Sequence, residues 1–193
     1  PEVSIIIVNY RGVEYTTQCI RSILSTDVKL PYEVIVVDNH SEDGSVQVLR
    51  SQFPDIRVIE AEENRGFGAA NNAGANIAEG DFLFFLNNDT KILDDCFTPL
   101  INFLREHRDC GIVAPKLIYP DGRFQLSYGR YPSLLNELRT KRLSREEENI
   151  TPPDIPQKKE WVTGAALCLR KELFLSIGGF DETYFMYFED ADL

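Results

Sequence analysis

Apolar runs of strand length alternate along this chain with segments whose apolar residues recur about once per helical turn. The first run is VSIIIVNY, residues 3–10, and the first helical pattern covers residues 13–25. Continuous apolar runs rich in β-branched residues are typical of strands buried on both faces. Further strand patterns follow at 32–41, 56–64, 81–89, 111–119 and 164–170, and further helix patterns at 41–53, 66–80 and 94–107. The alternation predicts an α/β fold, with a mostly parallel central sheet flanked by helices.

Polar side chains stand at the carboxyl ends of three of these predicted strands. They are Asn9 and Tyr10, then Asp38 and Asn39, then Asn87, Asn88 and Asp89. A single polar strand end is explained by turn chemistry, because Asn and Asp favour turns. Open α/β sheets, however, bind ligands outside the carboxyl ends of their strands. Three polar ends together therefore predict a ligand site along one edge of the sheet.

Two carboxylates at these ends suggest specific chemistry. Asp89 could hold a divalent cation, since Mg²⁺ needs only one or two protein carboxylates when water and substrate phosphates complete its shell; an ordinary acidic turn is the alternative. Asp38 could accept a hydrogen bond from a nucleotide base or a ribose hydroxyl. Its alternative role is to cap the next helix, although Ser41 and Asp43 are better placed for that.

The stretch NRGFGAANNAG, residues 64–74, combines an arginine with small residues at the start of a predicted helix. Arg65 offers a fork of donors for a base carbonyl or a phosphate, and small residues let a backbone approach a ligand closely. Neither a dinucleotide fingerprint nor a P-loop is present, because only G-x-G of the former matches and no G-K-[ST] follows.

The chain's last stretch, residues 161–193, gathers aromatic side chains before Glu189 and Asp190. Two adjacent carboxylates beside an apolar wall are costly unless they serve a function. One of them could deprotonate an attacking hydroxyl. Alternatively, the pair is an acidic first turn that favours the start of a helix.

A single domain covering residues 1–193 is expected from the length. We predict a ligand-binding half over about 1–115 and a second half over about 116–193, truncated at its C-terminus, with a flap near 120–160. Leucines and basic residues at 134–142 are expected to form a surface helix packed on the sheet, or alternatively a helix lying on a membrane.

Composition and charge narrow the function. The net charge of −11 argues against sequence-independent nucleic-acid binding. The four cysteines lie among apolar residues without a CxxC pair, which favours buried thiols in a reducing compartment over disulfides or metal ligands. No apolar run is long enough for a transmembrane helix. A cytoplasmic protein is expected, alternatively one at the inner face of the membrane.

Six blocks of this chain, in order, resemble the family-2 glycosyltransferases of the GT-A fold, and among them the rhamnosyltransferase-like group. They are VSIIIVNY, VVDNHSEDGS, NRGFGAANNAG, LNNDT, WVTGAALCLRK and GGFDETYFMYFEDADL. The resemblance covers the whole chain and implies an inverting transferase that moves a sugar, rhamnose among the candidates, from a nucleotide-diphosphate donor. The acceptor implied is a hydroxyl of a bacterial cell-surface glycan or of a lipid-linked sugar.

The resemblance also implies roles for individual residues. Asp190 would be the general base, and Glu189 would position it or the acceptor. The metal motif would be Asn87 and Asp89, holding Mg²⁺ or Mn²⁺, with Asn87 standing where the family's first acidic residue lies. Nucleotide contacts would come from Asn9, Tyr10, Asp38, Asn39, Arg65, Asn72 and Asn88. A non-catalytic nucleotide-sugar-binding module remains the alternative, and a nucleotidyltransferase is less favoured because NYRGVEYT lacks a glycine- and lysine-rich phosphate loop.

Overall fold

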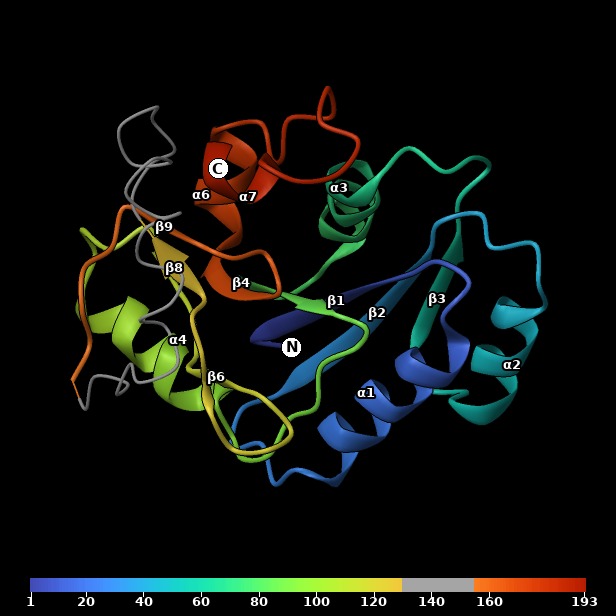
Figure 1. Ribbon diagram of the computed structural model, residues 1–193, viewed down its shortest axis with the longest axis horizontal. Coiled ribbons are helices and arrows are strands. Elements are labelled where there is room, and N and C mark those ends of the chain that lie inside the picture. The colour runs from blue at the N-terminus through green and yellow to red at the C-terminus, as the bar shows by residue number, and fades with distance from the viewer. Residues whose placement is uncertain (130–154) are drawn as a thin grey trace.

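The computed structural model describes residues 1–129 and 155–193, which form a six-stranded sheet between two layers of helices (Figure 1). The strand order is β3-β2-β1-β4-β10-β5. Four strands are parallel: β1 (Val3–Asn9), β2 (Tyr32–Asp38), β3 (Arg57–Glu60) and β4 (Phe82–Asn87). The prediction of a mostly parallel α/β sheet is confirmed.

The antiparallel part of the sheet comes from the second half of the chain. Strand β10 (Ala166–Arg170) lies antiparallel between β4 and the short strand β5 (Ile112–Val113). The single strand predicted over 111–119 is wrong. It is split into β5 and β6 (Leu117–Ile118) around Pro115, because proline has no N–H to donate to a strand ladder.

Helices cover both faces of the sheet, as the alternating pattern requires. On one face α1 (Val13–Ser25), α2 (Ser45–Gln52) and α4 (Phe97–Glu106) pack against the odd-numbered residues of β1, among them Ile5 and Ile7. On the other face α3 (Phe67–Ile77) and α6 (Lys171–Ser176) pack against Ile6. Both faces of the central strands are therefore buried, which explains their unbroken apolar runs.

The remaining described elements are short. Strands β6 and β7 (Phe124–Gln125) pair with each other, as do β8 (Tyr128–Gly129) and β9 (Trp161–Val162). Helix α7 (Glu189–Asp192) ends the chain beside β9. Part of the flap expected near 120–160, and the whole helix expected at 134–142, lie outside the described residues.

All four cysteines are free thiols, but the predicted burial is complete only for two of them, since Cys96 and Cys110 are partly exposed. Cys19 and Cys168 are buried in the core between the sheet and the α1, α2 and α4 layer. Within residues 1–129 and 155–193, no helix is both long and apolar enough to cross a bilayer.

Candidate active site

The strand register brings the predicted polar ends to the same level of the sheet. Asn9 at the end of β1 is the register partner of Asp38 on β2, and Val8 is the partner of Asn87 on β4. The chain leaves β1 for β2 on one side and later returns to β4 on the other, so the strand order reverses here. Such switch points are where open α/β sheets bind ligands.

A buried hydrogen-bond network connects these strand ends. The Asn9 amide donates to Asp38 Oδ2 at 2.6 Å and accepts from Thr16 Oγ1 at 2.7 Å. Asn88 Nδ2 in turn donates to Thr16 Oγ1 at 3.0 Å. The Ser41 backbone N–H and hydroxyl complete the shell of Asp38 at 2.9 and 2.7 Å. Asn9 and Asp38 are at most 1% exposed, so this network fixes the shape of the edge from within.

A pocket of about 260 Å³ opens between the ends of β2 and β3 and the first turns of α3. Two predicted nucleotide contacts, Asn39 and Arg65, line it together with alanines of α3. The Asn39 amide donates to Asn64 Oδ1 at 2.8 Å and to the Gly66 carbonyl at 3.1 Å, which orients the pocket wall. Arg65 is mostly exposed and donates to Glu182 at 2.5 Å.

The last two nucleotide candidates, Tyr10 and Asn72, do not line this pocket. Tyr10 is 46% exposed just beyond β1, with the Arg11 guanidinium 5.3 Å from its ring centre. The Asn72 amide bonds both the N–H and the carbonyl of Phe180, each at 2.9 Å, and reaches Glu182 at 3.1 Å. Asn72 therefore fastens α3 to the loop before α7.

Asp89 stands exposed in the turn after β4, and no hydrogen bond or ion pair with another described residue engages its carboxylate. No three His, Cys, Asp or Glu side chains in the described part of the chain gather closely enough to hold an ion. A lone free carboxylate fits a Mg²⁺ or Mn²⁺ ion that takes its other ligands from water and a substrate diphosphate. The neighbouring Asn87 side chain could supply an amide oxygen.

Asp190 and Glu189 differ sharply in environment, although they are adjacent. Asp190 is partly exposed, and its Oδ2 accepts a hydrogen bond from the Gly164 N–H at 2.8 Å. Glu189 is 6% exposed, and its Oε2 is buried without a partner among the described residues. Burial, with a smaller contribution from the Asp190 charge, raises the pKa of Glu189. Asp190 is thus the more solvent-accessible of the two carboxylates.

The segment Thr163–Ala165 links Asp190 to the end of β4. The Ala165 carbonyl accepts from the Asn87 N–H at 2.9 Å, while the next residue back, Gly164, donates to Asp190. An added Cβ at Gly164 would lie 3.3 Å from Asp190 Cβ, so α7 packs closely on this segment. The adjacent residues Gly164 and Ala165 therefore connect Asp190 to Asn87, the last residue of β4.

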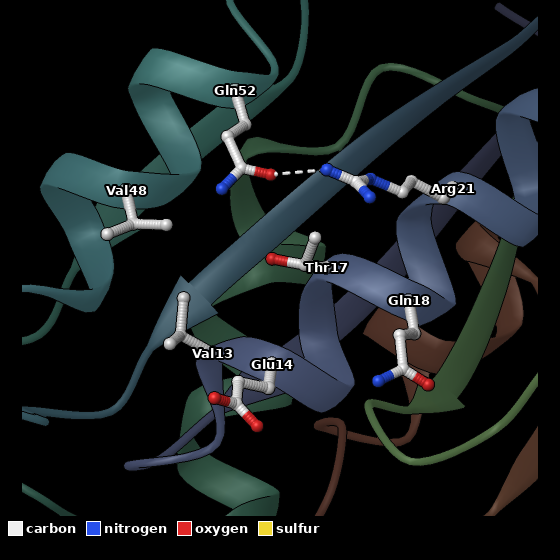
Figure 2. A pocket seen from close by; sticks show the side chains of 7 residues that line it. All are labelled: Val13, Glu14, Thr17, Gln18, Arg21, Val48 and Gln52. Atoms are coloured by element: carbon white, nitrogen blue, oxygen red, sulfur yellow. Dashed lines mark hydrogen bonds between the residues drawn. The ribbon is translucent and has the colours of Figure 1, made fainter.

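A second cavity of about 270 Å³ lies between α1 and α2 (Figure 2). Its lining is mixed, with Val13 and Val48 at one end and a hydrogen bond from Arg21 to Gln52, 2.9 Å long, at the other. None of the predicted site residues lines it. We interpret it as a groove between two surface helices.

Sequence reasoning missed three contributors to the site. Thr16 and Ser41 join the network at the strand ends, and the glycines of NRGFG make room for protein chain, with Gly66 against Phe185 and Gly68 against Phe180. A threonine in a helix and a serine in a turn carry no distinctive signal. The glycines did carry a signal, but it was interpreted as room for a ligand.

The chain is similar to a known protein family and to curated proteins. The model of the family described as "Glycosyl transferase family 2" matches residues 4–162. A curated relative, the N-acetylglucosaminyl-diphospho-decaprenol L-rhamnosyltransferase of Mycobacterium tuberculosis, is 28% identical over 195 residues. The alignment covers 88% of this chain but 62% of that protein, so the chain spans less than two thirds of its relative.

Two solved structures share the fold. The S. aureus TarS fragment 1–349, in complex with UDP-GlcNAc, superimposes with a TM-score of 0.71 at 21% identity, covering 99% of this chain and 51% of that chain. The mannosyltransferase PcManGT from Pyrobaculum calidifontis, in complex with GDP-Man and Mn²⁺, gives 0.66 at 22% identity, covering 99% and 50%. The expected GT-A fold is confirmed.

Proposed function

The chain belongs to glycosyl transferase family 2, and we propose that it moves a sugar from a nucleotide-diphosphate donor to an acceptor hydroxyl with inversion at the anomeric carbon. The observation that carries this proposal is the backbone link from Asn87 through Ala165 and Gly164 to Asp190. Through this link the partly exposed Asp190, as the base, would lie near the turn after β4 that carries Asp89.

The donor nucleotide occupies the pocket beside Asn39 and Arg65. At about 260 Å³ the pocket suits a nucleoside, with the diphosphate extending along the strand ends toward Asp89. Asn9, Asp38 and Asn88 keep that edge rigid through their shared network. Tyr10 is exposed at the same end of β1 and contacts the nucleotide from there. Asn72 holds the loop that carries Glu182, the partner of Arg65.

Asp89, with Asn87 beside it, would hold a divalent cation shared with the donor diphosphate. When bound there, such an ion would supply positive charge against the negative charge of the departing diphosphate. The presence of Mn²⁺ in the PcManGT complex supports this assignment. Because Asp89 offers few ligands of its own, the ion and the nucleotide diphosphate would bind tightly only together, which is the cation dependence that we propose.

Asp190 takes the proton of the acceptor hydroxyl during transfer. The acceptor oxygen forms a bond to the anomeric carbon as the bond from that carbon to the diphosphate oxygen breaks, and the nucleotide diphosphate leaves with that electron pair. The Gly164 N–H fixes one Asp190 oxygen and leaves the other for the acceptor proton. Glu189, buried behind Asp190, supports its position.

The identities of the donor sugar and of the acceptor are inferred from related proteins. The rhamnosyl transfer to a lipid-linked acceptor in the name of the mycobacterial protein supports a rhamnose donor and a lipid-linked or cell-surface glycan acceptor here. The UDP-GlcNAc complex of TarS supports a uridine nucleotide instead. A panel of donors must decide between them.

The test uses the full-length protein and calorimetric titration with UDP and dTDP, with and without Mn²⁺. We expect tight nucleotide binding only with the ion, and loss of that dependence in Asp89→Ala. Asp190→Asn should bind the nucleotide normally yet lose at least about 10²-fold in transfer rate, since a positioned base contributes about 10²–10⁴-fold. Nucleotide binding with no transfer from any donor would favour a non-catalytic binding module. Transfer by Asp190→Asn within tenfold of wild type would exclude Asp190 as the base.

A further inference from the structure

The pocket beside Asn39 and the segment that leads to Asp190 are connected by a close backbone contact between Gly66 and Phe185. The Phe185 carbonyl accepts a hydrogen bond from the Phe67 N–H at 3.1 Å, at the first residue of α3. A Cβ added to Gly66 would lie 2.1 Å from that carbonyl oxygen and 2.8 Å from its carbon. No side chain fits there without moving the backbone of residue 185.

The conformation of Gly66 also restricts this position to glycine. Its φ of 90° and ψ of 179° lie in a region that residues with a Cβ avoid. Two hydrogen bonds hold it there, one from its N–H to Asn64 Oδ1 at 3.0 Å and one from Asn39 Nδ2 to its carbonyl at 3.1 Å. Asn39 belongs to the pocket wall, so the contact is continuous with the donor side.

On the other side of the contact, Phe185 precedes Glu189 by four residues and Asp190 by five. The segment between them has a positive φ at Tyr187 and at Phe188, 71° and 73°, and these side chains are 73% and 57% exposed. With little side-chain packing to hold it, this segment depends on its ends. One end is the Phe185 carbonyl on α3, and the other is α7 with Asp190 bound to Gly164.

We propose that Gly66 is a positioning residue for the transfer reaction: by admitting the Phe185 carbonyl to the start of α3, it sets the place of Asp190 relative to the bound donor. The proposal rests on the proposed function for its kinetic part. Its structural part, that the 185–190 segment is docked through Gly66, stands independently of any activity. Gly66 thus makes room for the backbone of Phe185 and not for a ligand.

The first experiment compares Gly66→Ala with Gly44→Ala in the full-length protein. Gly44 is a matched control because its φ is also positive, 84°, while its added Cβ would meet nothing closer than 4.0 Å. We expect Gly66→Ala to lower kcat for transfer at least tenfold, with the Kd for nucleotide diphosphate and Mn²⁺ within threefold of wild type. Gly44→Ala should leave both within twofold.

Amide hydrogen exchange provides the readout that does not need activity. In Gly66→Ala the Phe67 amide should lose protection, and chymotrypsin should cut after Phe185 to Phe188 faster than in wild type. Gly68→Ala should change exchange less, because an added Cβ there lies 3.1 Å from Phe180 Cβ and 3.8 Å from Glu189 Cβ rather than against backbone.

A second pair covers the case in which Gly66→Ala fails to fold. Phe67→Pro and Phe67→Ala both remove the ring, but the proline alone removes the N–H that binds the Phe185 carbonyl. Proline is tolerated at the first position of a helix. We expect the proline variant to show at least a threefold lower kcat and faster cleavage of the 185–188 segment than the alanine variant, at equal nucleotide affinity.

Three results would overturn the inference: transfer by Gly66→Ala within twofold of wild type, an equal loss in Gly44→Ala, or a loss of nucleotide affinity that accounts for the lost rate. If the wild-type protein transfers no sugar from any donor, the proposed function fails. The exchange and cleavage measurements then still decide whether Gly66 docks the segment.

Discussion

At the scale of single residues, Asp38 illustrates how a charge can serve a site from inside the protein. Its carboxylate accepts three hydrogen bonds, two from Ser41 and one from Asn9, and it is 1% exposed. Since each donor has Asp38 as a principal partner, removing the carboxylate leaves buried polar groups unsatisfied. The residue predicted as a direct base contact is thus at the same time part of the scaffold of the strand ends.

We therefore predict that Asp38→Ala lowers the free energy of unfolding by about 2–4 kcal/mol, from hydrogen bonds to a charged group and the donors left unpaired. Urea unfolding measures this, and calorimetry with UDP shows whether affinity falls as well. Asp43→Ala is the matched control, since Asp43 is exposed in the same loop and accepts a hydrogen bond from the Ser45 N–H. This substitution should cost about 1 kcal/mol or less. Equal costs for the two variants would mean that the buried network contributes nothing.

The buried carboxyl group of Glu189 predicts how the stability of the fold depends on pH. Because burial raises its pKa in the folded state, the folded protein binds this proton more tightly than the unfolded chain does. Its contribution to stability is fully present below the ordinary Glu pKa of about 4.3 and is lost as pH rises through the raised folded value. Glu189→Gln cannot ionise, so it should gain stability over wild type as pH rises, by about 1.4 kcal/mol for each unit by which the pKa is raised.

Urea midpoints at pH 4 and pH 8 check this prediction for Glu189. Glu106→Gln, at an exposed position near the end of α4, is the control and should match wild type at both pH values. A Glu189→Gln variant that is less stable than wild type at pH 8 would show that the buried carboxylate is ionised and paired in the folded protein.

At the scale of elements, α4 ends without the glycine that commonly closes helices. Arg170 at the end of β10 instead binds one carbonyl of the last helical turn, that of the C-cap residue, and one in the loop that follows. The guanidinium donates to the carbonyls of Cys110 at 2.8 Å and His107 at 3.1 Å, and also to that of Leu104. A cation at a helix C-terminus also interacts favourably with the helix dipole. Arg170 thereby joins α4 to the antiparallel strand.

We predict that Arg170→Met lowers the free energy of unfolding by about 2–3 kcal/mol, because three carbonyls lose a charged donor. Arg108→Met, an exposed arginine just after α4, should change it by less than about 0.5 kcal/mol. Urea unfolding of both variants decides the matter, and a loss at Arg170 no larger than that at Arg108 would contradict the capping role.

Some of these elements could be predicted from the sequence and others could not. Strands β1, β2 and β4 were predictable because both of their faces are buried, which leaves an unbroken apolar pattern. The antiparallel insertion of β10 between β4 and β5 was not, because strand pairing is decided by contacts between distant segments. The same limit applies to the site: Asp38, Asp89 and Asp190 stand out by position, whereas Gly66 gains its meaning only when Phe185 folds onto it.

At the scale of the whole molecule, the cysteines can report folding and ligand binding together. Burial raises the pKa of Cys19 to about 12 and also raises that of Cys168, and both side chains lie in the core. At pH 8 a thiol with a pKa of about 12 is ionised in about one molecule in ten thousand, and the thiolate is the reactive form. Cys110, partly exposed in a loop, has a smaller barrier to labelling.

We predict that a thiol reagent at pH 8 labels Cys110 first, and Cys19 and Cys168 only when the molecule unfolds as a whole. UDP with Mn²⁺ at a hundredfold excess over Kd should then slow labelling of Cys19 and Cys168 about a hundredfold, because a ligand that binds only the folded state adds about 2.7 kcal/mol of stability. Labelling of Cys110 should stay within twofold and serves as the internal control, since a direct effect of Mn²⁺ on the reagent would slow all sites alike. Rapid labelling of Cys168 in the folded protein, or ligand protection in Asp89→Ala equal to that in wild type, would contradict the link between the strand-end site and global stability. Mass spectrometry of the labelled peptides resolves the three sites in one experiment.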